Sequence, residues 1–372
     1  MKMLIEKNVL MEGLNAVSKA LSTRNIIPVL NGIKFELKKD GLYLTATDND
    51  ITIQTFIDKK EIKDIGEIGC AIIYGKSLLD IIRKLPNTDI EIQNFENNEV
   101  SFKTETAMYN FNCFMNEDFP NIALDEVKDP VTLNAEKFKE FINKTSFACS
   151  LQESRPLLTG VNIKIVGDIL ECVATDSYRL SKTSYKLDKV YNENMNIVIP
   201  AKNINELVKI IDTDSELEIH VFSNKVLFKY ENIIFQSSLL NGTYPNTDNL
   251  IVQDFKYVIK ADLKSLYNTL DRASLLTQSK DKNIIDMELD NNILTIKASS
   301  LEMGKVEEKM MVENQTENQI KISYSAKYML EALKMFNNEN IYVLMNSEIS
   351  PIILKEVDNE EFVQLILPMK TY

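Results

Sequence analysis

The sequence predicts an α+β fold built from three tandem repeats of one domain, each with two helices packed on antiparallel sheet. Three observations lead to this prediction. Segments in which apolar and polar residues alternate recur between polar turns, amphipathic helical segments flank them, and the same order of elements appears three times. Alternation is typical of strands with one buried and one solvated face, whereas apolar residues three and four positions apart indicate a helix packed on a core.

Each copy is centred on a predicted hairpin that consists of a strand, a polar turn, a second strand and a second polar turn. The second turn contains Asp48 in the first copy and Asp176 in the second copy, 128 positions later, and Ser300 takes the same place another 124 positions on. Nearly constant spacing is typical of duplicated units that fold alike. The hairpins cover residues 33–48, 161–176 and 285–300.

One helix precedes each hairpin and another helix follows it. The six expected helices cover residues 7–20, 75–85, 135–148, 201–211, 261–274 and 325–336. The second helix of every copy carries a cation, an acid and a cation on one face, opposite its apolar face. These triplets are Lys76, Asp80 and Arg83 in the first copy, Lys202, Glu206 and Lys209 in the second, and Lys327, Glu331 and Lys334 in the third.

Matching polar turns end the first two copies and predict the domain boundaries. They are Asp118-Phe119-Pro120-Asn121 and Gly242-Thr243-Tyr244-Pro245-Asn246, each of which follows a group of alternating strands. We therefore expect a first domain over residues 1–125, a second over 126–252 and a third over 253–372.

Positive charge is concentrated in the predicted helices. They hold 14 Lys and Arg against 8 Asp and Glu, while the rest of the chain holds 28 against 47, for a net charge of −13. One interpretation is a set of solvated helix faces, stabilised by opposite charges that contribute about 0.2–0.5 kcal/mol per pair. The other is a weakly basic surface that attracts duplex phosphates without reading bases, within an acidic exterior that repels DNA.

Composition argues against several classes of protein. The four cysteines, at positions 70, 113, 149 and 172, lack the spacing of metal-binding or redox sites, which predicts reduced thiols in a cytoplasmic protein with no metal and no cofactor. The N-terminus has no signal-peptide core, and no segment approaches the roughly 20 apolar residues that span a bilayer. We therefore expect no membrane partner.

The sequence favours a non-catalytic protein over an enzyme. Because His220 is the single histidine, one chain cannot form a zinc site with several histidine ligands. His220 alternates with Ile219 and Val221, which predicts that it points to the wet face of a strand. Asp48 and Asp50 suggest a carboxylate metal site, but the repeat gives Asp48 the same turn position as Asp176. A repeat protein that binds only other proteins is a further alternative.

Several short motifs match one known family in order along the chain. Ala174-Thr175-Asp176 followed by Arg179-Leu180, together with Ile82-Arg83-Lys84-Leu85-Pro86 and the tail Leu367-Pro368-Met369-Lys370, resembles the bacterial sliding clamp, the beta subunit of DNA polymerase III. The resemblance extends over essentially the full length. That family usually carries Gly-His where this chain has Ser177-Tyr178.

The resemblance implies a DNA-clamp domain repeated three times and a head-to-tail homodimer that closes into a ring around double-stranded DNA. A head-to-tail contact forms a closed ring when the rotation between successive subunits adds up to a full turn, and an open filament when it does not. Such a sliding clamp is a processivity factor that tethers the replicative DNA polymerase catalytic subunit and also binds the clamp loader and other proteins with a clamp-binding motif. The residues that the resemblance places on DNA are Arg24, Lys76, Gln152, Arg155, Pro156 and Leu157, and the repeat adds Lys202.

The resemblance also implies one peptide-binding pocket per subunit and a subunit contact between domains one and three. A partly exposed apolar cleft with a few polar groups suits a short peptide. The pocket positions are Leu158, Thr175, Ser177, Tyr178, Arg179, Leu180, Pro245, Leu250, Tyr328, Ile349, Leu365, Ile366, Leu367, Pro368 and Met369. The dimer positions are Tyr109 and Phe111, which we expect on an edge strand, and Leu275 and Leu276 of the other subunit.

Overall fold

The computed structural model describes residues 1–21, 26–95, 98–252, 254–277, 283–300, 302–316, 319–357, 359 and 361–369. The chain forms two compact units. One contains residues 1–139 and 202–239, and the other contains residues 140–201 and 240–372. The segment expected to form the central domain is divided between the units, because its strands extend the sheets formed by the chain on either side of it.

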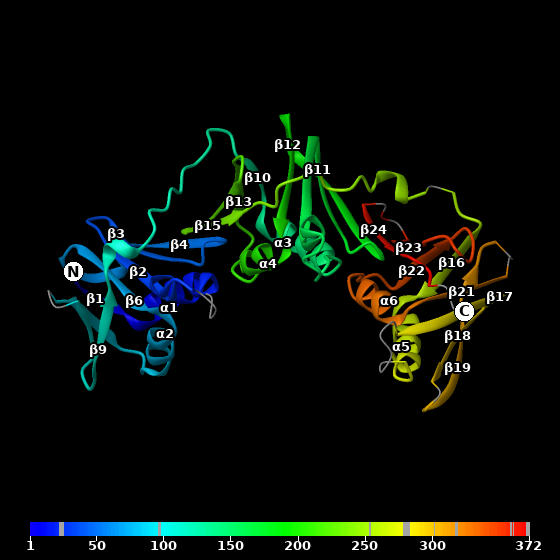
Figure 1. Ribbon diagram of the computed structural model, residues 1–372, viewed down its shortest axis with the longest axis horizontal. Coiled ribbons are helices and arrows are strands. Elements are labelled where there is room, and N and C mark those ends of the chain that lie inside the picture. The colour runs from blue at the N-terminus through cyan, green and yellow to red at the C-terminus, as the bar shows by residue number, and fades with distance from the viewer. Residues whose placement is uncertain are drawn as a thin grey trace. The chain divides into compact units, whose positions relative to one another are not determined.

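The first unit is built on one sheet of 13 described strands, with α1 and α2 packed side by side against it (Figure 1). The strand order is β10-β13-β14-β15-β4-β3-β2-β6-β9-β8-β7-β1-β5, and every neighbouring pair is antiparallel. The pairing of β15 with β4 joins the later strands to the earlier ones, from Ile233 opposite Thr55 to Ser237 opposite Ile51.

The elements of this unit have the following bounds: β1 Lys2–Glu6, α1 Lys7–Val17, β2 Gly32–Leu37, β3 Gly41–Thr47, β4 Ile51–Asp58, β5 Ile62–Glu67, β6 Gly69–Tyr74, α2 Gly75–Lys84, β7 Asp89–Asn94, β8 Glu99–Lys103, β9 Met108–Phe114, β10 Val131–Asn134, β13 Glu216–Val221, β14 Lys225–Tyr230 and β15 Ile233–Ser238. Two helices cross a unit boundary, α3 Ala135–Ser146 and α4 Ala201–Val208.

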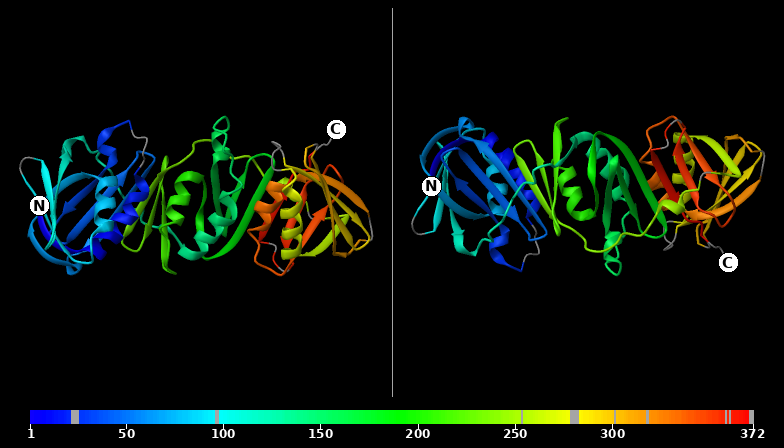
Figure 2. Two further views of the ribbon diagram at one scale, coloured as in Figure 1. Left: turned by 90° about the horizontal axis from the view of Figure 1, so that it is seen from below. Right: turned by 90° about the horizontal axis from the view of Figure 1, so that it is seen from above.

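The second unit contains a sheet of seven described strands, in the order β11-β12-β24-β23-β22-β16-β20, and a sheet of four, in the order β19-β18-β17-β21. Helices α5 and α6 pack side by side in this unit (Figure 2). Its elements are β11 Gly160–Thr175, β12 Arg179–Pro200, β16 Tyr257–Asp262, α5 Leu263–Ser274, β17 Ile284–Asp290, β18 Ile293–Ser300, β19 Gly304–Met311, β20 Glu313–Asn314, β21 Ile320–Ser325, α6 Ala326–Leu333, β22 Asn340–Met345, β23 Ile352–Glu356 and β24 Phe362–Ile366.

All six expected helices are present, with some of their ends shorter than predicted. Helix α1 ends at Val17 and continues as a 3₁₀ turn over Ser18–Ala20, and α4 ends at Val208 because the amides of Ile210 and Ile211 both donate to the Leu207 carbonyl in a tighter turn. Helix ends often tighten in this way, and apolar periodicity does not register the change.

The backbone shows the threefold repeat directly at the helix starts. The amide of Lys7 donates to Thr88 O, that of Ala135 to Ser215 O, and that of Leu263 to Glu339 O. In each case the first residue of the first helix is tied to the segment that follows the second helix. The three donors are 128 positions apart, which confirms the repeat predicted from the pattern.

The polar turns of the repeat share one set of hydrogen bonds. Asp48 Oδ1 accepts from the amides of Asp50 and Ile51, and Asp176 Oδ1 accepts from those of Tyr178 and Arg179, all at 2.9–3.0 Å. In the third copy Ser300 Oγ accepts from the amides of Glu302 and Met303. Asp or Ser occupies this position because its short side chain carries an oxygen that accepts hydrogen bonds from the amides of its own turn.

Candidate functional site

A mostly apolar pocket of about 550 Å³ lies in the second unit, beside the turn that joins β11 to β12. Its floor is part of a buried cluster that includes Leu158, Leu180 and Leu365, and Leu367 packs against the same cluster. The lining residues are Arg155, Pro156, Leu157, Leu158, Thr175, Ser177, Arg179, Leu180, Thr243, Pro245, Asn246, Thr247, Leu250, Pro351, Leu365 and Leu367. An open apolar cleft with few polar groups can hold the side chains of a short peptide.

The turn from Thr175 to Arg179 forms one wall of this pocket. Thr175 donates its amide to the Tyr244 hydroxyl and its hydroxyl to the Arg179 carbonyl, which fixes both ends of the turn. Burial raises the pKa of Tyr244 above its usual range, so its hydroxyl stays protonated. Ser177 sits at φ 77°, a left-handed conformation that glycine adopts at lower cost than serine.

Arg179 ties this wall to two helices. Its guanidinium pairs with Asp176 at 3.1 Å, donates to the Phe147 carbonyl at 2.8 Å, and forms a close ion pair with Glu331 of α6. It also lies 4.6 Å from the centroid of the Tyr328 ring. The side chain is only 9% exposed, and these partners use a donor on each of its three nitrogens. Arg179 therefore holds the pocket together rather than offering a free charge to a ligand.

Nine of the expected pocket residues line the cavity: Leu158, Thr175, Ser177, Arg179, Leu180, Pro245, Leu250, Leu365 and Leu367. Ile366 does not, because successive strand residues face opposite ways and it lies fully buried in the core on the other side of β24. Tyr178 and Ile349 are exposed outside the lining, while Tyr328 stacks on Arg179. Pro368 and Met369 follow the lining residue Leu367, and the amide of Met369 donates to Ser323 O.

The residues expected on DNA fall into two groups. Lys76 on α2, Lys202 on α4 and Gln152 in the loop after α3 are exposed. Arg155, Pro156 and Leu157 line the apolar pocket where the 3₁₀ turn Pro156–Thr159 begins, and Arg155 and Pro156 are exposed as well. Arg24 lies outside the described residues.

The cations of the helical charge triplets are exposed, whereas the acids Glu206 and Glu331 are only partly exposed, and the ion pairs of the three triplets differ. Asp80 approaches Arg83 at 4.0 Å, and Glu206 pairs with Lys209 at 2.7 Å. In α6 the acid of the triplet, Glu331, pairs with Arg179 instead. Lys327 and Lys334 remain exposed at the ends of that triplet.

The residues expected at a subunit contact are partly exposed. Tyr109 and Phe111 lie on β9, which pairs with β8 along Met108–Asn112 but reaches β6 only at its last two residues. Among the described strands, none pairs with the other side of residues 108–112, so this stretch is an edge, as expected. Leu275 directly follows α5 and is 56% exposed, and Leu276 is half-buried.

Comparisons with known proteins match the whole chain. The family descriptions "DNA polymerase III beta subunit" for the N-terminal, central and C-terminal domains match residues 1–123, 132–246 and 248–370. The chain is 36% identical to a beta sliding clamp of Bacillus subtilis and 34% identical to one of Staphylococcus epidermidis, with full coverage of both partners in each case. The chain belongs to the bacterial DNA polymerase III beta subunit family.

Solved structures agree with this assignment. The crystal structure of a DNA polymerase sliding clamp from Bacillus subtilis has a TM-score of 0.97, and that of a DNA polymerase III beta chain from Streptococcus pneumoniae, 30% identical, has a TM-score of 0.96. In both comparisons the match extends over the full length of this chain and of the solved chain. The chain is thus a sliding clamp, a non-catalytic processivity factor of three clamp domains.

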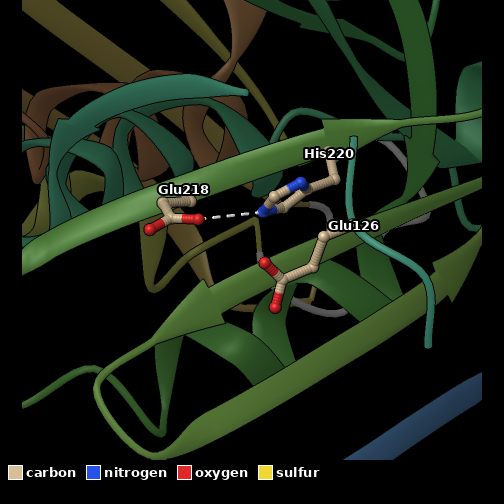
Figure 3. A group of neighbouring side chains, drawn as sticks. All are labelled: Glu126, Glu218 and His220. Atoms are coloured by element: carbon tan, nitrogen blue, oxygen red, sulfur yellow. Dashed lines mark hydrogen bonds and ion pairs between the residues drawn. The ribbon is translucent and has the colours of Figure 1, made fainter. Parts of the chain in front are cut away.

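His220 of this clamp corrects a prediction. It was expected on a wet strand face, but it is 1% exposed, because residues 123–127 pack over β13 and β14. The amide of Val127 donates to His220 Nδ1 at 3.0 Å, and Nε2 lies 3.1 Å from Glu218 (Figure 3). Only a packing partner distant in sequence buries this side chain, so alternation along the strand could not reveal it.

The same cluster is the group of acids and histidine in the described chain that comes nearest to a metal site. Glu126, Glu218 and His220 place one ligand atom each within 4.8 Å of the others (Figure 3). A metal would need the lone pair of Nε2, but the Val127 amide already uses the lone pair of Nδ1, so the neutral ring carries its proton on Nε2. We therefore interpret the cluster as a structural link, to which Lys229 adds an ion pair with Glu126 at 2.9 Å.

The cysteines of this clamp are thiols with raised pKa values. Burial raises the pKa of Cys149 to about 12 and that of Cys113 to about 11, and it raises those of Cys70 and Cys172 as well. The thiolate is the reactive form, so none of the four is primed for catalysis at neutral pH. None of the described helices has the length and apolar character needed to cross a membrane.

Proposed function

We propose that two copies of this chain close head to tail into a ring around duplex DNA, slide along it without reading its sequence, and hold replication proteins through the apolar pocket. The threefold repeat of helix pairs with exposed cations carries the proposal, since six such domains would surround a duplex with diffuse positive charge. Weak contacts to phosphates position a protein on DNA without specifying a site, which suits sliding.

The exposed Lys76, Lys202 and Gln152 are the proposed DNA contacts, together with Arg24. The charges of Lys76 and Lys202 lie on helix faces whose opposite sides are buried. The net charge of −13 supports confinement of DNA to these faces, since an acidic exterior repels it.

The pocket is the proposed attachment site for a short apolar peptide of the replicative polymerase catalytic subunit, of the clamp loader and of other clamp-binding proteins. It combines the leucines of its floor with hydrogen-bonding groups at its rim, which is the composition of a peptide-binding cleft. Ile366 is left out of the proposal because its side chain faces the core.

Dimerisation through β9 and the end of α5 would close the ring. The unpaired side of residues 108–112 offers backbone groups for strand pairing across the interface, and Leu275 offers an exposed apolar side chain. Domain boundaries near 125 and 252 would then give the three domains per subunit, and the ring would work in the cytoplasm.

Retention on DNA tests this function. Clamp loaded onto nicked circular duplex should stay bound through gel filtration in about 1 M salt, where screening removes contacts to phosphates. Clamp on linear duplex of the same sequence should be lost within minutes, because a ring runs off a free end. Equal loss from circular and linear DNA would contradict the proposal.

A further inference from the structure

The first two copies of the repeat close the end of their second helix with a lysine from their first helix. In the first copy, the Lys7 ammonium donates to the Leu85 carbonyl, one residue past the end of α2. In the second copy, the Lys139 ammonium donates to the Ile211 carbonyl at 2.6 Å. The two carbonyls are 126 positions apart, as are the lysines that begin the two helical charge triplets, so they are equivalent. A cation suits this position because the last carbonyls of a helix lack partners and carry the negative end of its dipole.

The third copy has no lysine at either of these positions. Counted on by 128 positions per copy, the two lysine positions fall on Leu263 and Tyr267 of α5. The equivalent carbonyl is that of Phe336, 125 positions after Ile211, and no hydrogen bond is donated to it within the described part of the chain. An ammonium group that the first two copies supply from their own sequence is therefore missing from the third.

A mostly apolar pocket of about 470 Å³ lies at this position in the third copy. Leu263 and Tyr267 both line it, together with Leu333 at the end of α6 and Glu339. The Leu263 amide donates to the Glu339 carbonyl, which is the backbone bond that marks the same position in every copy. The pocket thus opens where a lysine side chain lies in the other two copies.

The charged groups of this lining leave room for a cationic ligand. The lysines of the lining, Lys264 and Lys334, are both exposed, and the Lys334 ammonium lies 5.8 Å from the centroid of the Tyr267 ring. The face of this ring can therefore attract an ammonium group. Of the two acids, Asp262 accepts from the Ser265 amide, whereas the Glu339 side chain is exposed at the rim.

We propose that this pocket binds a free diamine or polyamine, one ammonium of which does for the third copy what Lys7 and Lys139 do for the first two. That ammonium donates to the Phe336 carbonyl, the methylene chain lies on the apolar lining, and a second ammonium pairs with Glu339. A volume of about 470 Å³ is in the range of pockets that hold small molecules, which favours a free ligand. The inference does not depend on the proposed binding of DNA or peptides.

Calorimetric titration of the full-length clamp with 1,5-diaminopentane tests the proposal. A salt concentration of about 0.15 M, where the Debye length is about 8 Å, suppresses diffuse attraction of cations to a chain with a net charge of −13. We expect one saturable site per chain. Its affinity should exceed by at least about tenfold that for pentan-1-ol, which has the chain without the charge, and that for Mg²⁺, which has the charge without the chain. Nα-acetyl-lysine amide, which lacks the second ammonium, should also bind more weakly.

Four variants assign the binding to this pocket. Tyr267→Lys and Leu263→Lys restore the lysines of the second and first copies, and each should weaken binding of 1,5-diaminopentane by at least about tenfold. Leu151→Lys adds the same charge at a residue that is 97% exposed and outside the lining, and it should leave the affinity unchanged. Lys334→Met should strengthen binding about threefold, because it removes an exposed like charge beside Tyr267.

The melting temperature of each lysine variant shows whether it is folded, and one folded variant is enough for the test. A lack of saturable binding to the unmodified clamp overturns the proposal, and so does binding that persists in a folded Tyr267→Lys or Leu263→Lys variant. Equal affinity for pentan-1-ol would instead assign the pocket to apolar ligands. Tighter binding of Nα-acetyl-lysine amide than of the diamine would assign it to a lysine of another protein, which also contradicts a free polyamine.

Discussion

Arg179 shows how one buried charge can organise a binding site. Its guanidinium joins the turn at Asp176, the end of α3 at Phe147 and helix α6 at Glu331. A buried ion pair is a weak argument for stability in itself, but removal of one partner leaves charges and carbonyls without compensation. The same residue that closes the pocket wall therefore also contributes to the fold of the second unit.

Replacement of Arg179 by Met should lower the free energy of unfolding by about 3 kcal/mol, because Asp176 and the Phe147 carbonyl lose their buried partner. Urea unfolding followed by circular dichroism measures the change. The control is Lys186→Gln, whose pairing with Asp168 at 3.5 Å is exposed, and it should cost less than about 0.5 kcal/mol. Equal stabilities for the two variants would show that the buried network contributes little.

At the residue scale, the sequence located the pocket better than it assigned individual side chains. The turn at Asp176 and the apolar residues around it were identifiable by motif and resemblance. The prediction that was wrong depended on a neighbour distant in the chain, since His220 is covered by residues 123–127. Two other placements also depended on such neighbours: Ile366 faces the core because of the strand register, and Arg155 reaches Ser177 across 22 positions. Local pattern carries no information on such contacts.

At the scale of elements, periodicity predicted the six α-helices of the described residues and most hairpins, but it could not predict which strands pair in a sheet. The central segment extends two sheets, through β15 on β4 and β12 on β24, and only the folded chain reveals these pairings. Strand β11 shows a second limit, since its register with β12 shifts around Gly167, which adopts φ 64° at the turn predicted between two strands. Amphipathic alternation sets which face is buried, but not which strand is the neighbour.

Helix α5 has a titratable cap that gives a pH-dependent prediction. Asp262 Oδ1 accepts from the Ser265 amide at 2.7 Å, and hydrogen bonds from Ser265 hold the pKa of Asp262 below its ordinary value. A lowered folded pKa means that the ionised cap stabilises the protein above the unfolded pKa of about 3.9 and loses this effect as pH falls through the folded pKa.

Asp262→Ala should therefore lower stability by about 1 kcal/mol at pH 7. The gap between its melting temperature and that of the unmodified chain should stay constant down to about pH 4 and narrow below it. Asp271→Ala, near the opposite end of the same helix, is the control and should be neutral or slightly stabilising, since an acid near a helix C-terminus opposes the dipole. A gap that widens on acidification would contradict the capping role.

At the scale of the whole molecule, the repeat fits the proposed role of one chain as half of a ring. Three helix starts with the same backbone bond, 128 positions apart, and three turns with the same capping pattern indicate one unit used repeatedly. Each use leaves a sheet edge, and within the chain two such edges are joined, by β15 with β4 and by β12 with β24. Residues 108–112 of β9 are one of the edges left unpaired among the described strands, and they are the edge proposed for the contact between subunits.

Leu275→Asp should accordingly convert the assembly to single chains of 42.6 kDa at micromolar concentration, as measured by light scattering. The new charge would be buried without a partner at the contact with β9, which costs several kcal/mol. Leu151→Asp is the matched control, since Leu151 is 97% exposed and is not one of the residues proposed for the interface. It should keep the mass of two chains and its retention on nicked circles, whereas Leu275→Asp should lose both. If both variants keep the larger mass, the subunit contact lies elsewhere; if the unmodified chain is itself a monomer, the ring proposal fails.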